Sequence, residues 1–189
     1  MANLHLANLQ EAKLQGADLY GANFQGTDLQ GADLQNADLQ EAKLGGVKLE
    51  GVYLIGIDFQ GANFQGVDFH EANLQMANLQ EANLEGANLQ GANLHGTNLQ
   101  DAELYGANLQ MANLQGANLQ GAHLKWTDLE KVNLQGANLK GTHHLLIDQL
   151  SKVKTLYDTK LDEEFLIPLK KKYLALFDVP ELPNLKDKK

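Results

Sequence analysis

Few residues in this chain of 189 could carry catalytic chemistry. It has no cysteine, its single serine is Ser151, and it contains no phosphate-binding loop, dinucleotide-binding motif or G-x-S-x-G motif. An enzyme needs a nucleophile, a base and a stabilising group that converge in one pocket. The sequence therefore predicts a protein that is not an enzyme, with no catalytic residue, no cofactor and no metal site.

Histidine is the side chain here that would most readily bind a transition metal. The six histidines are separated in the sequence, except for His143 and His144, which are adjacent. Adjacent residues point in different directions and rarely ligate one metal together. Position 144 is also where a repeating leucine is due, so we interpret the pair as a disrupted repeat.

Carboxylates dominate the charged residues. The chain has 24 Asp and Glu against 15 Lys, and it has no Arg, which gives a formal net charge of −9. Because a nucleic-acid binder needs a basic surface, we expect no direct binding to nucleic acid. The sequence shows no signal peptide and no apolar run of transmembrane length, so we expect a cytoplasmic protein without membrane contact.

The elements that must position these residues follow a period of five. From Leu4 to Leu139 every fifth residue is Leu or Phe, which gives 28 repeats without an insertion, and the residue two before each is Ala, Val, Ile or Thr. A period of five fits neither a helix nor a flat strand. It suits a coil that turns after each repeat and directs one large and one small side chain inward.

The triplets ADL, ANF and ANL, followed by Gly, resemble the pentapeptide-repeat family. The resemblance covers residues 1–141 and implies an all-β solenoid, a right-handed quadrilateral β-helix in which four repeats make one coil. The repeats would then form about seven coils, and at roughly 4.8 Å per coil the rod would be about 34 Å long.

We expect residues 142–178 to form a helical cap on the rod, like the tails of relatives in photosynthetic bacteria, and residues 179–189 to be a frayed tail. Asp148 could cap a first helix and Asp162 could begin a second, with Pro168 breaking or starting a turn there. The apolar residues with helical spacing in the first segment are Ile147, Leu150, Val153 and Leu156.

The acids fall on two opposite faces if residues 20 apart stack, as the resemblance implies. Each of these faces has a net charge of −5, and the other two are near neutral. We interpret the exposed carboxylates of the two acidic stripes mainly as a surface that keeps the rod soluble, and the alternatives are that they bind a partner or hold a cation. The first acidic stripe contains Asp18, Asp38, Asp58, Glu41, Glu81 and Asp101, and the second contains Asp28, Asp68 and Glu71.

Outward apolar residues suggest a second candidate site. Tyr53, Ile55 and Met76 fall together on a near-neutral face and form a possible apolar patch for a partner. Trp126 lies at a corner near the C-terminal tail, and we expect it to pack against that tail.

The residue before each large residue changes along the chain. In the first 14 repeats it is Asp six times and Asn four times, whereas in the second 14 it is Asn eleven times. Either a partner binds the more acidic half, or two repeat arrays of different composition were joined.

Nothing in the sequence precedes the first coil to cover it. Either a second molecule stacks there, so that the protein associates with itself, or residues such as Leu6 fold over the coil, or the chain was cut from a longer one.

Two functions from different classes remain open. The first is a non-enzymatic structural or protein-interaction rod with an unknown protein partner. The second is implied by the resemblance, because some pentapeptide-repeat proteins are acidic DNA mimics that bind a type II topoisomerase (gyrase). About 34 Å of B-DNA carries on the order of 20 negative charges, whereas residues 1–140 have a net charge of −10. This difference favours the interaction rod.

Overall fold

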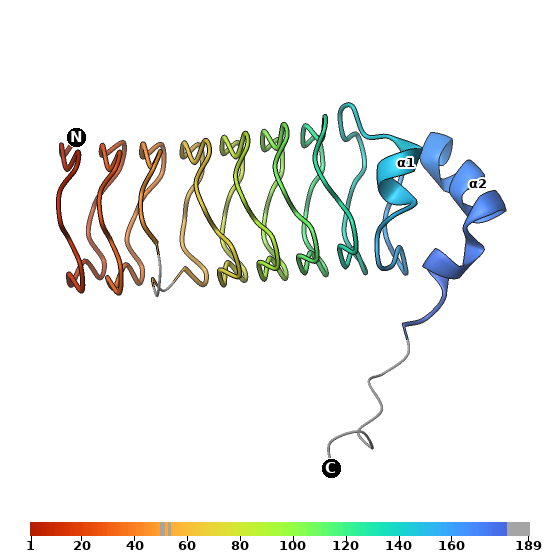
Figure 1. The fold of residues 1–189 in the computed structure, drawn as a ribbon, viewed down its shortest axis with the longest axis horizontal. Coiled ribbons are helices and arrows are strands. Elements are labelled where there is room, and N and C mark those ends of the chain that lie inside the picture. Colours follow the sequence, from red (N-terminus) through yellow and green to blue (C-terminus); the bar gives the residue numbers. More distant parts are fainter. Residues whose placement is uncertain (50–51, 53, 181–189) are drawn as a thin grey trace, which may run out of the picture.

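The computed structural model describes residues 1–49, 52 and 54–180, which form a rod of stacked coils that ends in a helical cap (Figure 1). Parallel bridges link residues 20 apart, from Asn3 and Asn23 at one end to His123 and His143 at the other. Four repeats of five residues therefore make one coil, and residues 20 apart stack in columns along the rod.

Each repeat is a short extended segment followed by a tight corner. In one example, Oδ1 of Asn98 accepts the backbone N–H of Gln100 at 3.2 Å. The N–H of Ala102 then donates to the Leu99 carbonyl at 3.1 Å and closes the corner. The corner residue Asp101 has a φ of 55°, a conformation that glycine adopts most readily and that most corners fill with glycine. The Asp or Asn before each large residue thus satisfies an amide that the inter-coil ladder leaves unpaired.

The large and small residues of each repeat form the core. Phe59, Phe64 and Phe69 pack edge to face, with ring centroids 4.9 and 5.0 Å apart. Where the small residue is Thr, its hydroxyl bonds to the neighbouring coil, as when Thr97 Oγ1 donates to the Leu74 carbonyl at 2.9 Å. Burial of each large side chain contributes roughly 1.5–3 kcal/mol, which makes this axis the main source of stability.

The ladder continues beyond residue 141, where the sequence period ends. The additional bridges are Asn133 to Thr155 and Asn138 to Lys160. The residues joined by these bridges are 22 apart instead of 20. The two extra residues lie in the segment between His143 and Thr155, which contains helix α1, Ile147–Leu150. Leu156 and Leu161 are buried and fill the axis there. The chain therefore adds two sides of a further coil to the seven that its regular repeats form.

Helix α1 is much shorter than the helix that the apolar spacing predicted. Val153, expected on that helix, lies beyond its end and is buried in the added sides of the coil. The N-cap is Leu146, so the prediction that Asp148 caps the helix is wrong. Asp148 lies instead in the first turn, where its Oδ2 accepts a bond from Lys152 Nζ at 2.7 Å.

Helix α2, Glu163–Lys172, and the 3-10 helix η1, Leu174–Phe177, lie across the end of the rod (Figure 1). Asp162 is the N-cap of α2, as expected, and its carboxylate accepts the N–H of Gly141 at 2.8 Å. Pro168 lies inside α2 and does not break it, because the packing of the inner face outweighs the loss of one backbone bond. The residues that pack there are Phe165, Leu166, Leu169, Tyr173, Leu176 and Phe177.

The first coil is less buried than the coils that follow. Its half-buried large residues are Leu4, Leu9 and Leu14. The alternative in which Leu6 folds over this coil is contradicted, because Leu6 is 70% exposed and its side chain extends toward Gly26 of the second coil. Association of two molecules through the first coil stays a prediction.

Candidate interaction surface

The first acidic stripe contains a column of three carboxylates. Bridges join Asp18 to Asp38 and Asp38 to Asp58, so these residues stack along the rod. Oδ1 of each accepts the backbone N–H two residues on, at 3.0 to 3.2 Å, and Asp58 Oδ2 also accepts Gln40 Nε2 at 3.0 Å. Neighbouring parallel strands lie roughly 4.8 Å apart, so like charges in this column repel one another.

The other three acids of this stripe occupy corners beside that column. Glu41, Glu81 and Asp101 have φ values of 55 to 58°. A hydrogen bond to the Glu41 carboxylate is the largest effect that raises the pKa of Tyr20, followed by burial and by the charges of Glu41 and Asp38. Among the residues that the structure describes, no acid of the first stripe forms an ion pair. The first stripe is therefore an uncompensated row of negative charge.

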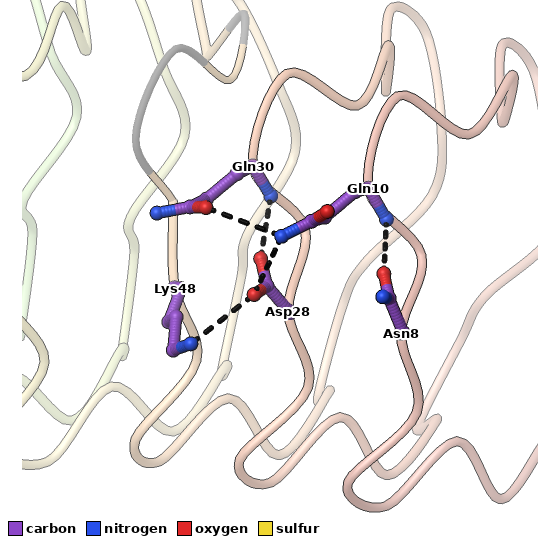
Figure 2. A network of polar contacts seen from close by, with 5 residues as sticks. All are labelled: Asn8, Gln10, Asp28, Gln30 and Lys48. Atoms are coloured by element: carbon purple, nitrogen blue, oxygen red, sulfur yellow. Dashed lines mark hydrogen bonds and ion pairs between the residues drawn. The ribbon is translucent and has the colours of Figure 1, made fainter.

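The second acidic stripe is partly neutralised (Figure 2). Asp28 Oδ2 accepts Lys48 Nζ at 3.1 Å and Gln10 Nε2 at 3.0 Å, and its Oδ1 accepts the Gln30 N–H at 3.2 Å. Burial acts to raise the pKa of Asp28, but these hydrogen bonds and the Lys48 charge outweigh it and hold the pKa below the ordinary value. Figure 2 also shows Gln10 bonded to Gln30, so the amides of successive coils join the network.

Asparagine side chains 20 residues apart are joined by hydrogen bonds along the rod, and we call each such row an amide column. These amide columns explain part of the change from Asp to Asn along the chain. Asn78 Nδ2 donates to Asp58 Oδ1 at 2.9 Å, and Asn98 Nδ2 donates to Asn78 Oδ1 at 3.0 Å. The bonds continue in the same direction through Asn118 and Asn138. Since a carboxylate only accepts, an aspartate suits the N-terminal end of such a column. Asp68 likewise lies on the N-terminal side of Asn88 in a second column, where its Oδ1 accepts Asn88 Nδ2 at 2.9 Å.

A cluster of rings lies beside the C-terminal cap. The structure brings Tyr105 and His123 to the adjacent His143 and His144, a grouping that the sequence analysis missed because the residues belong to different coils. Tyr105 Oη and His123 Nδ1 are 2.7 Å apart, and the His123 and His143 ring centroids are 4.5 Å apart. The spacing of 20 residues between His123 and His143 could have predicted that these two rings stack in neighbouring coils. Within the described chain, no group of three histidines or acids is arranged to hold a metal.

The predicted apolar patch is described only in part. Tyr53 lies outside the described residues, while Ile55 is half-buried and Met76 is 64% exposed at a corner. Trp126 is 77% exposed, and the Lys125 ammonium lies 4.2 Å from its ring centroid. The expectation that Trp126 packs against the C-terminal tail is therefore wrong. Trp126 occupies a corner with a φ of 62°, and its side chain points outward.

Comparison with known proteins identifies the repeats. A family model described as pentapeptide repeats, in eight copies, matches residues 2–40, 37–75, 77–110 and 107–143. No curated protein matches the chain significantly. None of the helices in the described residues is long and apolar enough to cross a membrane.

Several solved structures are similar to the chain. QnrB1, a plasmid-mediated fluoroquinolone resistance protein, is 18% identical, with 95% of this chain and 100% of that chain covered and a TM-score of 0.46. HetL, a pentapeptide-repeat protein of the cyanobacterium Nostoc involved in heterocyst differentiation regulation, is 29% identical, with 84% and 86% covered and a TM-score of 0.38. Rfr23, a pentapeptide-repeat protein of the cyanobacterium Cyanothece, is 27% identical, with 85% and 88% covered and a TM-score of 0.30.

Proposed function

Because this chain belongs to the pentapeptide-repeat family, we propose that it is a non-enzymatic rod that binds a protein partner through its first acidic stripe. The observation that carries the proposal is the column of Asp18, Asp38 and Asp58, which stack without a cation partner among the described residues. We propose also that the coils turn in the right-handed sense that family membership implies.

A stack of like charges destabilises the free rod, and a basic partner would relieve that repulsion. The carboxylates are fixed in place, because each has one oxygen bonded to its own corner amide. Within the described residues the second oxygens of Asp18 and Asp38 accept no hydrogen bond, whereas Asp58 Oδ2 accepts Gln40 Nε2. Binding through these fixed carboxylates would cost little side-chain entropy. The expected partner is a protein surface with lysines or arginines spaced along one direction.

The test compares two triple variants with the same change in charge. D18N/D38N/D58N removes the column, and each Asn retains the oxygen that accepts the corner amide. D33N/E85Q/E103Q removes three acids from the two near-neutral faces. In pull-downs from the native host, capture of the partner should fall at least tenfold with the first variant and stay near wild type with the second. Equal capture by both variants would remove the proposal.

A second candidate is binding to a type II topoisomerase in place of DNA, and the two opposed acidic stripes favour it. Six lysines in residues 1–140 and the Lys48–Asp28 pair of 3.1 Å reduce the likeness to a duplex. Inhibition of gyrase supercoiling by micromolar protein, lost in D18N/D38N/D58N, would support this candidate. Full supercoiling activity at that concentration would exclude it.

A further inference from the structure

One side of the last regular coil is not followed by another coil. Three of its four columns of stacked residues continue into the C-terminal segment, through the bridges His123 to His143, Asn133 to Thr155 and Asn138 to Lys160. Within the described residues, the bridges of the fourth column end at Asp128. The residue 20 further on, Asp148, lies in helix α1 instead (Figure 1). The helix therefore leaves the coil edge at Asp128 without a parallel neighbour.

The missing neighbour leaves the backbone N–H of Leu129 without a hydrogen bond among the described residues. Its equivalents donate to the next coil, Leu109 to the Asp128 carbonyl at 3.0 Å and Leu89 to the Asn108 carbonyl at 2.7 Å. Leu129 is 2% exposed, so its N–H is buried. Nearly all buried backbone donors in native proteins are paired. The coil edge therefore calls for an acceptor at this position.

The carbonyls on the same side of the coil are already satisfied. Gln149 Nε2, from helix α1, donates to the Leu124 carbonyl at 2.9 Å and to the Thr127 carbonyl at 2.8 Å. This side-chain amide replaces the backbone N–H of a further coil, which the Asp128 N–H supplies to the Ala107 carbonyl at 3.0 Å. What this side of the coil lacks is therefore an acceptor and not a donor.

A hollow of about 370 Å³ lies at this coil edge. Its apolar lining residues are Trp126, Leu129 and Leu146. Trp126 and Leu146 are 77% and 61% exposed, and exposed tryptophans are frequent anchors of protein interfaces. The hollow thus combines an unpaired backbone donor with apolar surface.

The charged groups in and beside the hollow give it a negative potential. Asp128 lines it and forms no ion pair among the described residues. Lys152 also lines it, but its Nζ is already bonded to Asp148 Oδ2 at 2.7 Å. This bond and the charge of Asp148 raise the pKa of Lys152, and the charges of Asp128 and Glu130 add to the rise, against the opposing effect of burial. A cation is therefore favoured beside Asp128.

We propose that this hollow, referred to below as the junction site, binds a short extended segment of a partner protein with a lysine, an apolar residue and a second lysine in succession. The backbone carbonyl of the first lysine accepts the Leu129 N–H, and its side chain stacks on Asp128. The fold already contains this arrangement earlier in the column, where Lys48 forms a bridge with Asp28 and its Nζ lies 3.1 Å from Asp28 Oδ2 (Figure 2). An added strand of this kind gains affinity from backbone bonds and specificity from its alternate side chains.

The order of residues in the segment follows from the register. Successive side chains of a strand point to opposite sides, so the apolar residue faces Leu129 and Leu146 while both lysines face outward. The second lysine then stacks beside Glu130, which also lines the junction site. The junction site continues the column of Asp28 and not that of Asp18, so it goes beyond the first acidic stripe and does not rest on it.

The fluorescence of Trp126 gives a direct test, since Trp126 is the only tryptophan in the chain and lines the junction site. Titration of the full chain with the capped peptide GKLKG should give a saturable change. The peptides GELEG and GKSKG, which reverse the charges or remove the apolar side chain, should bind at least fivefold more weakly. Equal binding of the three peptides, or no saturable change with GKLKG, would overturn the inference.

A matched pair of variants tests the role of Asp128. D128N keeps the oxygen that accepts the Glu130 N–H and should weaken GKLKG binding at least threefold. D33N makes the same change in another column and should bind the peptide as wild type. Equal affinities of D128N and D33N would overturn the inference.

Hydrogen exchange supplies a second measurement that needs no variant. In the free chain the Leu129 amide should exchange faster than the Leu109 amide, and GKLKG should slow it. Equal protection of the two amides in the free chain, or no slowing by the peptide, would overturn the inference. D18N/D38N/D58N should bind GKLKG as wild type, so failure of the junction site and failure of the first acidic stripe are distinguishable.

Discussion

At the scale of single residues, one side-chain oxygen helps to fix the corner in most repeats. Asp or Asn before the large residue accepts the amide two residues on, as Asn98 does for Gln100. Both residue types supply that acceptor, so the sequence alone does not separate a structural aspartate from one that meets a partner. The structure separates them by what the second oxygen contacts: Lys48 in the case of Asp28, but no cation in the case of Asp18, Asp38 or Asp58 within the described chain.

The Asp28 carboxyl gives a prediction on pH. Its pKa lies below the ordinary value, so its contribution to stability is present above the unfolded pKa of about 3.9 and is lost as pH falls through the folded pKa. K48M removes the cation and should raise the pKa of Asp28 toward the ordinary value. NMR titration of the Asp28 carboxyl carbon measures this, with Asp33 as the internal control. An unchanged Asp28 pKa in K48M would show that Lys48 does not contribute.

The buried Thr97 hydroxyl gives a prediction on stability. It donates to the Leu74 carbonyl of the preceding coil at 2.9 Å and is fully buried. T97V keeps the shape and removes the donor, so it should lower the free energy of unfolding by about 1 kcal/mol. Urea denaturation of the full chain measures the difference. A variant as stable as wild type would mean that the bond has no net value.

At the scale of elements, the amide columns have a direction. Each Nδ2 donates toward the N-terminus, from Asn138 through Asn118 and Asn98 to Asn78 and then to Asp58. A regular five-residue period predicts that columns exist, and residues 20 apart form them once four repeats make a coil. The direction of the bonds depends on side-chain geometry that the sequence does not contain.

This direction predicts opposite outcomes for two single changes. N98D replaces a donor in the middle of the column by an acceptor that faces Asn78 Oδ1, so it should destabilise the chain by about 1–3 kcal/mol at pH 7. Asp58 lies at the N-terminal end of its column, so D58N keeps the acceptor for Asn78 and gains a donor that faces Asp38. The Gln40 amide, which donates to Asp58 Oδ2, must turn so that its Oε1 accepts this donor, as Gln80 Oε1 does for Asn98. D58N should be neutral or stabilising. Urea denaturation of both variants tests this, and equal destabilisation would contradict a directed column.

The cap shows where reasoning from the sequence failed. Helical spacing of Ile147, Leu150, Val153 and Leu156 predicted one long helix, but the chain forms a helix of four residues and then returns to the ladder. Leu156 and Leu161 are five residues apart, with Thr159 two before the second, so the repeat resumes in the sequence with a shifted register. Backbone pairing with the preceding coil outweighs helical propensity in this segment.

At the scale of the whole molecule, the repeat determines the fold and the departures from it determine the surface. The columns and the opposed acidic stripes follow from the numbering of the repeats. The 77% exposure of Trp126 does not follow from the numbering, because a pattern of apolar residues does not reveal which way a corner side chain points.

The central claim is that the first acidic stripe binds a basic protein partner, and the most direct measurement is the affinity of the purified partner for matched charge variants. Titration calorimetry at 50 and 200 mM salt should give wild-type binding that weakens with salt, since exposed charges are screened. D18N/D38N/D58N should bind at least tenfold more weakly at the lower salt and lose most of the salt dependence, whereas D33N/E85Q/E103Q should match wild type. Equal affinities and equal salt dependence for the two triple variants would contradict the claim.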